Sequence, residues 1–278
     1  MLVRAFGPDD VDLAVRLSFR EGWNLSADDL RTLLKLDPRG CLIAEVEGRP
    51  VGLVTTVAYG KLGWIGLLVV EEASRGQGYG RALLDTAVGR LLDRGVRTVG
   101  VDATPQAMPL YSDARFRPAF DIVHLRRAAL PAPAPTANSL VPVEPKDLHA
   151  LTMFDWAYFG GRRRRVLADL LQRSSVGYLA QDVTGTGGYL LARQGSQQWV
   201  IGPWVCVRAA ESLLTQALSA IGPQPVALAV PEVNRHAMDL VRKYHFEPCS
   251  RRVRMYYGDE EGVGQPQHIY AIASVNKG

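Results

Sequence analysis

The sequence predicts an α+β protein that consists of two tandem domains. Three observations support this prediction. A glycine-rich turn lies between an apolar strand and an amphipathic helix in the first half, a segment rich in proline and alanine interrupts the chain near its middle, and the order of elements in the first half returns in the second. A length of 278 residues also fits two domains of ordinary size.

The first half alternates strands and helices. A strand is expected at residues 2–6, and a helix with one apolar face follows Pro8. Residues 26–29 read Ser-Ala-Asp-Asp, a capping box that predicts the start of a second helix, and Pro38 predicts its end. The remaining elements are, in order, a hairpin of strands at 41–47 and 51–59, a strand at 64–70, a helix at 81–92, a strand at 98–103, a short helix at 107–111, and a strand pair at 118–127.

The glycine-rich turn spans residues 74–81 and reads Ser-Arg-Gly-Gln-Gly-Tyr-Gly-Arg. Three glycines allow a tight loop that can approach a ligand closely. The loop runs into a helix N-terminus, where N–H groups and the positive end of the dipole favour an anion. We therefore predict a diphosphate cradle. It is neither a Walker A loop, which needs Lys-Ser/Thr, nor the G-x-G-x-x-G of a dinucleotide fold.

The pattern that fits is [QR]-x-x-G-x-[GA], filled by Arg75, Gly78 and Gly80. It resembles the acetyl-CoA loop of the GNAT superfamily of N-acetyltransferases, and the β-α-α-β-β-β-α-β-α-β order of the first half is also the GNAT order. The resemblance implies a mixed, mostly antiparallel sheet flanked by helices in each domain, with acetyl-CoA as cosubstrate and no metal. It also implies that the strand before the loop splays from its neighbour and pairs with pantetheine. The cofactor-binding residues would be Leu68, Val69, Val70, Arg75, Gly76, Gln77, Gly78, Tyr79, Gly80 and Arg81.

The resemblance also offers catalytic candidates. Tyr111 occupies the position of the family's tyrosine in N-x-x-A-x-x-L-Y-x-x-x-G-F, and a phenol with a pKa near ~10 can protonate a leaving thiolate. Thr104 replaces the usual Asn of this pattern and Arg115 the usual Gly, which puts the loop geometry in question. Asp102 and Glu45 are equal candidates for the base, beside a base that acts through water. Simple aromatic packing is the alternative role for Tyr111.

Two residues near the end of the first helix, Trp23 and Asn24, are candidates for lining the acceptor pocket, with core packing as the alternative for Trp23. This region lies between the first two helices, where GNAT folds receive the acceptor.

Residues 129–139 form the predicted linker, because their alternating prolines favour extended backbone and exclude a packed helix. The expected domains are residues 1–128 and 140–278. The second repeats the first in degenerate form: Gly66 and Leu83 are 17 positions apart, whereas their counterparts Gly202 and Leu213 are 11 apart. The missing positions coincide with the cradle, so we expect one cofactor site, in the first domain.

Composition limits the remaining classes. The net charge of +4 suits a polyanionic cofactor. The arginine run at residues 162–165 lacks interleaved aromatic residues, so we expect a solvated helix start and no nucleic-acid partner, although binding through this run is a third, weaker hypothesis. Three widely spaced cysteines favour a reducing cytoplasm over disulfides or zinc. No apolar run reaches the ~18–20 residues of a membrane span, and the first residues lack a signal-peptide pattern.

The sequence therefore predicts a cytoplasmic N-acetyltransferase that moves an acetyl group from acetyl-CoA to a small-molecule or peptide amine, as a monomer or homodimer. The alternative is a non-catalytic acyl-CoA-binding regulatory or sensor protein that keeps the cradle.

Overall fold

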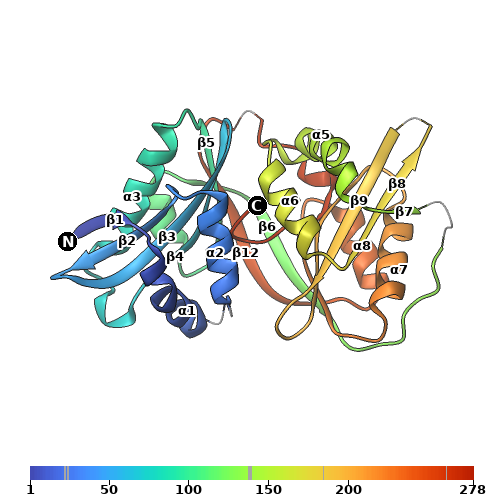
Figure 1. Ribbon diagram of the computed structural model, residues 1–278, viewed down its shortest axis with the longest axis horizontal. Helices are drawn as coiled ribbons and strands as arrows, with labels where there is room; N and C mark the ends of the chain where they lie inside the picture. The colour runs from blue at the N-terminus through green and yellow to red at the C-terminus, as the bar shows by residue number, and fades with distance from the viewer. Residues whose placement is uncertain (22, 24, 137–139, 184, 261) are drawn as a thin grey trace. The chain divides into compact units, whose positions relative to one another are not determined.

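The chain divides into two compact units in a computed structural model that describes residues 1–21, 23, 25–136, 140–183, 185–260 and 262–278. Unit 1 consists of Met1–Pro118, Met255–Glu261 and Val275–Gly278 (Figure 1). Unit 2 consists of Ala119–Arg254 and Gly262–Ser274. These units differ from the expected ranges 1–128 and 140–278, because two late segments of the chain belong to unit 1.

Two long strands account for this difference. The strand β6 (Arg117–Arg127) starts in unit 1 and continues in unit 2, and β12 (Glu247–Gly258) starts in unit 2 and ends in unit 1. The expected boundary at residue 128 rests on the prolines that follow it. These prolines indicate a local break in regular structure, and they do not indicate that β12 ends in unit 1.

The sheet of unit 1 has the order β1-β2-β3-β4-β5, followed by the end of β12. Its neighbouring strands are antiparallel from β1 to β4, and β4 is parallel to β5. The bounds are Leu2–Ala5 for β1, Cys41–Val46 for β2, Arg49–Tyr59 for β3, Leu62–Val70 for β4 and Thr98–Ala103 for β5.

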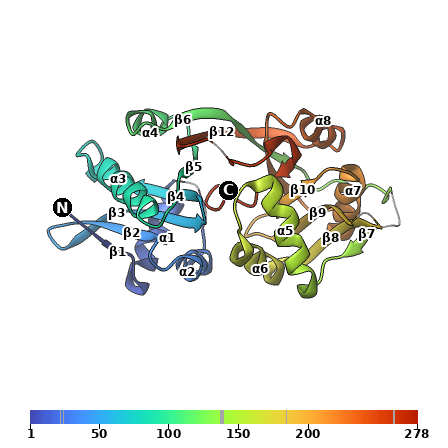
Figure 2. The same cartoon turned by 90° about the horizontal axis from the view of Figure 1, so that it is seen from above.

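Helices cover both faces of this sheet (Figure 2). The helix α3 packs on β3 and β4, and Gly63 faces it, because a Cβ there would lie 3.1 Å from Leu91 and 3.0 Å from Val96. The helices α1 and α2 contact β3 from the other face. The bounds are Val11–Arg20 for α1, Ala27–Leu36 for α2, Tyr79–Leu92 for α3 and Met108–Asp113 for α4, with 3-10 turns at Pro8–Asp10 (η1) and Glu72–Ser74 (η2). The expected capping box forms, since Asp29 N donates to Ser26 Oγ at 3.1 Å.

Unit 2 repeats this arrangement with the strand order β6-β11-β10-β9-β8-β7 and one parallel pair, β10 and β11. Its strands are β7 (Leu140–Pro142), β8 (Val176–Asp182), β9 (Gly185–Gln194), β10 (Trp199–Cys206), β11 (Val226–Pro231) and β13 (Ile269–Ala271). Its helices are α5 (Leu148–Phe159), α6 (Arg164–Arg173), α7 (Ala210–Ile221) and α8 (Arg235–Lys243), with 3-10 turns at Pro145–Asp147 (η3) and Pro266–His268 (η4). Both units are thus α+β with a mixed, mostly antiparallel sheet, as the sequence predicts.

A backbone detail supports the repeat. Arg115 and His245 both have left-handed backbone, with φ of 67° and 63°, immediately before a buried phenylalanine. In both units the amide of that phenylalanine donates to the carbonyl five residues earlier, at 2.9 Å for Phe116 and 3.1 Å for Phe246. Arg115 stands where the family pattern has a glycine, and the turn after α4 keeps the left-handed backbone that suits a glycine. A residue with a side chain adopts this backbone conformation at an energetic cost.

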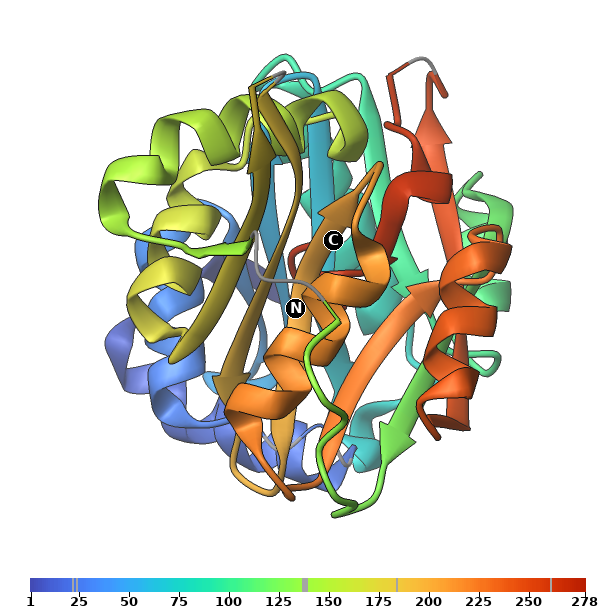
Figure 3. The ribbon, with the colours of Figure 1, turned by 90° about the vertical axis from the view of Figure 1, so that its right-hand side faces the viewer.

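The proline-rich segment is irregular but anchored. Its described residues, 129–136, form neither helix nor strand, and residues 137–139 lie outside the described part of the chain. Arg127 donates to the carbonyl oxygens of Leu130 and Pro131, and the hydroxyl of Thr136 lies 3.1 Å from that of Thr215 on α7. Figure 3 shows this segment running along α7.

One arginine of the basic run is fully buried, contrary to the expectation of a solvated helix start. Arg163, 2% exposed, makes two hydrogen bonds of 2.8 Å to the carboxylate of Asp155, which is 0% exposed. Tyr189 donates to the same carboxylate at 2.5 Å, and burial together with the charge of Asp155 raises the pKa of this phenol. Arg162 stacks on the Trp156 ring. Arg162 and Arg163, two of the four arginines at residues 162–165, therefore have structural contacts within unit 2.

None of the described helices is long and apolar enough to cross a membrane.

Candidate active site

The strands β4 and β5 separate partway along their length. Their parallel pairing covers Leu62↔Thr98, Gly63↔Val99 and Trp64↔Gly100, whereas β4 continues to Val70. Where the pairing ends, β4 bulges against β3: its register shifts between Leu53↔Val69 and Thr55↔Gly66, and Leu67 has a φ of 42°. A left-handed leucine stores strain of the kind that concentrates at functional sites. The bulge turns the far end of β4 away from β5 and leaves one edge of its backbone unpaired with that strand.

The glycine-rich turn follows this edge. Gly76 and Gly78 have φ of 76° and 82°, and a Cβ on either glycine would meet nothing within 4 Å. The left-handed Gly78 is the N-cap of α3, so the first amides of the helix face out of the turn without helical acceptors. Gly80 lies inside the first turn, where a Cβ would touch Val70 at 3.6 Å and Leu110 at 3.8 Å.

The arginines at the two ends of the turn are engaged with neighbouring acids. The Nε of Arg75 donates to the Val70 carbonyl at 3.0 Å, and its Nη2 makes an ion pair with Glu21 at the end of α1. Arg81 binds Asp85 one helical turn later, at 2.8 Å. Both ion pairs are partly exposed and hold the arginines beside the turn, where the backbone amides and the helix dipole also favour an anion.

This geometry fits coenzyme A. The open, left-handed glycines and the helix N-terminus form a cradle for a diphosphate. The unpaired edge of β4 leads directly into the cradle and offers backbone groups to an amide-containing chain such as pantetheine.

Tyr111 lies on α4, close to the start of α3 through its neighbour Leu110, which approaches Gly80. Its side chain is buried, 5% exposed, and packs edge to face on Phe116 with ring centroids 5.5 Å apart. The packing role that the sequence left open for Tyr111 is therefore present in the structure, and its role as the acid stays a prediction.

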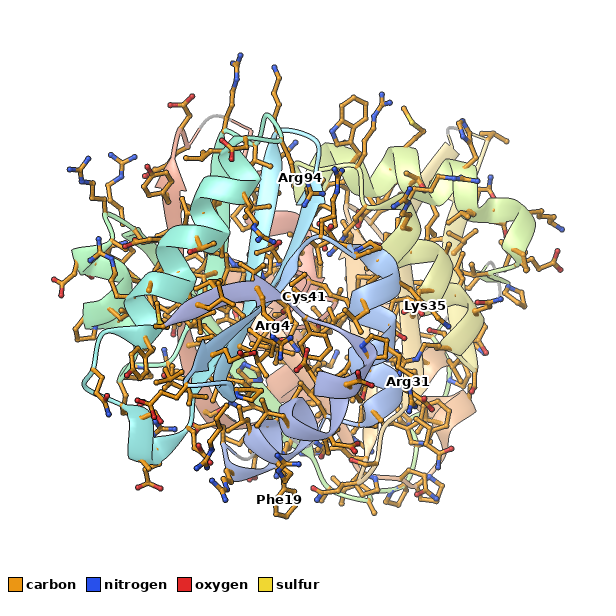
Figure 4. The ribbon with its side chains drawn as sticks, turned by 60° about the vertical axis from the view of Figure 1, so that its left-hand side comes forward. Arg4, Phe19, Arg31, Lys35, Cys41 and Arg94 are labelled. Atoms are coloured by element: carbon orange, nitrogen blue, oxygen red, sulfur yellow. The ribbon has the colours of Figure 1, made fainter. Side chains whose placement is uncertain are left out.

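The two candidates for the base have different surroundings. Asp102, 5% exposed, follows Gly100 by two residues on β5 and so points to the same face as Trp64, past the point where β4 has left β5. Glu45 lies on β2, and its carboxylate accepts a hydrogen bond of 2.7 Å from Arg4, which also binds Asp10. Figure 4 shows Arg4 on β1, the first strand in the order of this sheet. The position of Asp102 fits a base at the split, whereas Glu45 is engaged in an ion pair at the sheet edge.

Of the two acceptor candidates, Trp23 is half-buried beyond α1, and its amide donates to the Ser18 carbonyl at 2.9 Å. Asn24 lies outside the described residues. Glu21, two residues before Trp23, connects this region to the cradle through Arg75.

Residues that the sequence did not single out also lie at the split. The last four residues, Val275–Gly278, belong to unit 1. The Val275 carbonyl accepts a hydrogen bond from Trp64 Nε1 at 3.0 Å, and the Lys277 carbonyl accepts one from the Tyr59 hydroxyl at 2.9 Å. A segment so far from β4 in sequence gives no local signal that it lies there.

In unit 2 the chain itself occupies the place that matches the split between β4 and β5. The strand β13 pairs with β10 at Trp204↔Ala271 and Val205↔Ile269, beyond the pairing of β10 with β11. On the other side, the amide of Ile272 donates to the Ala229 carbonyl of β11 at 2.9 Å. The chain's own backbone thus fills the split between the parallel strands of unit 2.

Comparisons with known proteins agree with these features. Residues 10–115 match the Acetyltransferase (GNAT) family model, and residues 151–271 match a second model described as an Acetyltransferase (GNAT) domain. Over 267 residues the chain is 26% identical to "Holothin acyltransferase" from Pseudoalteromonas sp. (strain SANK 73390), covering 93% of this chain and 88% of that protein. It is 24% identical to "Uncharacterized N-acetyltransferase YitH" from Bacillus subtilis (strain 168), covering 94% of this chain and 92% of the relative.

A solved structure from Pyrococcus horikoshii, described as a candidate acetyltransferase, superposes with a TM-score of 0.86 at 25% identity, covering 100% of this chain and 95% of the other. Two GNAT matches in succession, each over one of the two repeats, together with acyltransferase relatives along nearly the whole length, establish that this chain belongs to the GNAT superfamily of acetyltransferases as a tandem member.

Proposed function

We propose that unit 1 binds acetyl-CoA along β4 and the cradle and transfers the acetyl group directly to an amine. The observation that supports this most is the sequence of features along one stretch of chain: a strand that leaves its parallel neighbour, then two open left-handed glycines, then a helix N-terminus. The first feature suits pantetheine and the other two suit a diphosphate. The cofactor-binding residues remain those expected from the sequence, Leu68 to Val70 and Arg75 to Arg81.

The bound cosubstrate would supply an acetyl thioester. Backbone amides at residues 68–70 would donate to its carbonyl oxygen as negative charge develops there. Asp102 would accept the proton that the amine loses, directly or through water, and the phenol of Tyr111 would give a proton to the departing sulfur. The amine nitrogen forms the new bond to the acetyl carbon while the carbon–sulfur bond breaks, so that the products are an amide and coenzyme A.

We further propose that each chain has one cofactor site. Unit 2 lacks the residues of the cradle, and β13 lies where β10 and β11 part. Asn234 Nδ2 donates to the Ile269 carbonyl at 3.1 Å and so anchors this strand from the start of α8.

The alternative of a non-catalytic sensor is not favoured, because the chain's relatives carry acyltransferase and N-acetyltransferase names. GNAT enzymes act on small-molecule or peptide amines, and the particular amine is open here. A cytoplasmic location and a monomeric or homodimeric state stay predictions.

Incubation of purified protein with acetyl-CoA and a panel of amines tests this proposal. The panel should include amino acids, polyamines, aminoglycosides and peptides with free N-termini. Longer acyl-CoA donors should be added, because one relative is named for acyl rather than acetyl transfer. We expect amine-dependent release of coenzyme A, with an acetylated product detected by mass spectrometry. Binding of acetyl-CoA without transfer to any amine in the panel would favour the sensor instead.

A further inference from the structure

The end of α1 is joined to the chain around the cradle by two ion pairs of opposite sense. Glu21, the C-cap of α1, pairs with Arg75 near the start of the glycine-rich turn. Arg20, the last residue of α1, has its Nη1 3.7 Å from a carboxylate oxygen of Glu71, which follows β4. Two consecutive residues at the end of α1 therefore contact both ends of the short segment that connects β4 to the turn.

Arg75 is held on two sides. Its Nε donates to the Val70 carbonyl at 3.0 Å, and its Nη2 donates to the Glu21 carboxylate. A guanidinium is planar and its N–H groups have fixed directions, so two bonds to separate acceptors set its orientation. The Nη1 group has no hydrogen-bond partner among the residues that the structure describes. The side chain is half exposed and directly precedes Gly76, so the guanidinium remains accessible to an anion bound at the turn.

The ion pair of Glu21 and Arg75 is exposed enough to open. The side chain of Glu21 is 30% exposed and that of Arg75 is 50% exposed. An ion pair in contact with water contributes little to stability by itself, because the loss of side-chain entropy offsets much of the Coulomb attraction. A second partner that fixes the guanidinium makes the pair stronger, since less side-chain freedom is then lost when the pair forms. An anion at the turn is such a partner.

The same ion pair restrains the region in which the acceptor is expected. The amide of Glu21 donates to the Leu17 carbonyl at 3.2 Å, and the amide of Trp23 donates to the Ser18 carbonyl at 2.9 Å. Both residues are thus bonded back onto α1, and Trp23 is half-buried beyond its end. Holding the Glu21 side chain therefore also restrains Trp23, the described candidate for lining the acceptor pocket.

We propose that Glu21 is a positioning residue that couples the two substrates of the transfer. This inference rests on the proposed acetyl transfer in unit 1. The diphosphate of the bound cosubstrate fixes Arg75, the fixed guanidinium holds Glu21, and the end of α1 with Trp23 becomes ordered. The acceptor then binds to a region that is already in place, so each substrate binds more tightly in the presence of the other. Glu21 itself touches neither substrate.

Titration of the amine that the panel identifies, with and without saturating coenzyme A, measures this coupling. Coenzyme A carries the diphosphate but no acetyl group, so the amine binds without reacting. The factor by which coenzyme A tightens amine binding should be about three- to fivefold larger in the wild type than in Glu21→Gln, as befits an exposed ion pair. Gln keeps the size of the side chain and removes its charge. The amine KM at saturating acetyl-CoA should rise by the same factor in this variant, with kcat nearly unchanged.

A double variant shows whether Glu21 acts through Arg75. The family pattern accepts glutamine at the position of Arg75, so Arg75→Gln removes the charge and keeps a residue that suits the turn. In this background Glu21→Gln should have no further effect on the amine KM, because the ion pair is already lost. An equal rise in the amine KM in both backgrounds would show that Glu21 contacts the acceptor directly, and would overturn the positioning role.

Asp85→Asn is the matched control. Asp85 binds Arg81 within α3 at 2.8 Å, so this variant also removes an acid from an arginine beside the turn but leaves the link to α1 intact. It should keep the wild-type coupling. Loss of coupling in both Glu21→Gln and Asp85→Asn, or in neither, would overturn the inference while the proposed function stands. Failure of the wild type to bind acetyl-CoA and to acetylate any amine would instead overturn the proposed function, and this inference with it.

Discussion

The carbonyl oxygen of Val275 accepts a hydrogen bond of 3.0 Å from the indole of Trp64, 211 residues earlier in the chain. This bond, with the one from Tyr59 to Lys277, makes the C-terminal residues an integral part of unit 1. The end of β12 is another late segment of the same unit, and the Asp259 carbonyl accepts from Thr98 Oγ1 on β5. The unit that holds the candidate active site is therefore completed only when the last part of the chain is present.

A fragment of residues 1–128 should consequently fail to fold cooperatively. The fragment lacks the end of β12, which lies next to β5, and the tail that accepts a hydrogen bond from Trp64. The edge of β5 would then be exposed and prone to pair with other chains, and the Trp64 indole N–H would lose its acceptor. Thermal unfolding followed by circular dichroism, together with size-exclusion chromatography, measures this. As a control, the full chain cleaved within residues 128–136 retains every segment and should stay folded. A fragment that melts cooperatively near the temperature of the full chain would contradict the assignment of these segments.

Gly78→Ala should weaken acetyl-CoA binding more than it affects the fold. The substitution puts a methyl group into the open space of the cradle and costs about 1–2 kcal/mol for a left-handed alanine. Gly60→Ala provides a matched control, because Gly60 has a φ of 80° and equally open surroundings but lies in the turn between β3 and β4. We expect similar losses of stability in both variants and a rise in Kd of about tenfold or more in Gly78→Ala alone. Equal Kd values in the two variants would exclude the cradle as the binding site.

Tyr111→Phe should lower kcat without altering acetyl-CoA affinity. Phenylalanine keeps the edge-to-face packing on Phe116 and removes only the hydroxyl. Loss of a general acid typically costs about 10²–10⁴-fold in rate. Steady-state kinetics with the best amine of the panel, alongside calorimetry, separates the two effects. An unchanged kcat would leave Tyr111 with the packing role alone.

Asp155→Asn should destabilise unit 2 strongly. The change removes the charge that neutralises the buried guanidinium of Arg163, and breaking one partner of a buried ion pair costs about 3–5 kcal/mol. Asp182→Asn is the comparison, because its ion pair with Arg208 is about half exposed, and such pairs contribute about 0–1 kcal/mol. Denaturant titration gives both values. Losses of similar size in the two variants would show that Asp155 is not a buried partner.

Local patterns in the sequence predicted the site's backbone well. The strand at 98–103 has those bounds in the structure, and the cradle turn has the left-handed glycines and following helix that its spacing indicates. The helix starts at Tyr79 rather than 81, because Gly78 already serves as its N-cap. A few consecutive residues determine these features, because glycine adopts left-handed backbone easily and because the apolar residues of a helix recur on one face.

Contacts between residues far apart in the sequence could not be predicted from local patterns. The return of Val275–Gly278 to unit 1, the insertion of β13 beside β10 and the burial of Arg163 against Asp155 all join residues whose local sequence is unremarkable for such roles. Four consecutive arginines look like a solvated surface until the structure shows a carboxylate and a phenol facing one of them. Thr55 is a similar case, since only the packed sheet reveals that its hydroxyl has no partner among the described residues.

The most direct measurement is calorimetric titration of the full chain with acetyl-CoA. The account predicts one molecule bound per chain, because unit 1 has the split strand and the cradle while β13 fills the equivalent split in unit 2. Heat with a stoichiometry near one, abolished or strongly weakened in Gly78→Ala, would agree with it. The absence of binding, or two equivalent sites per chain, would contradict it.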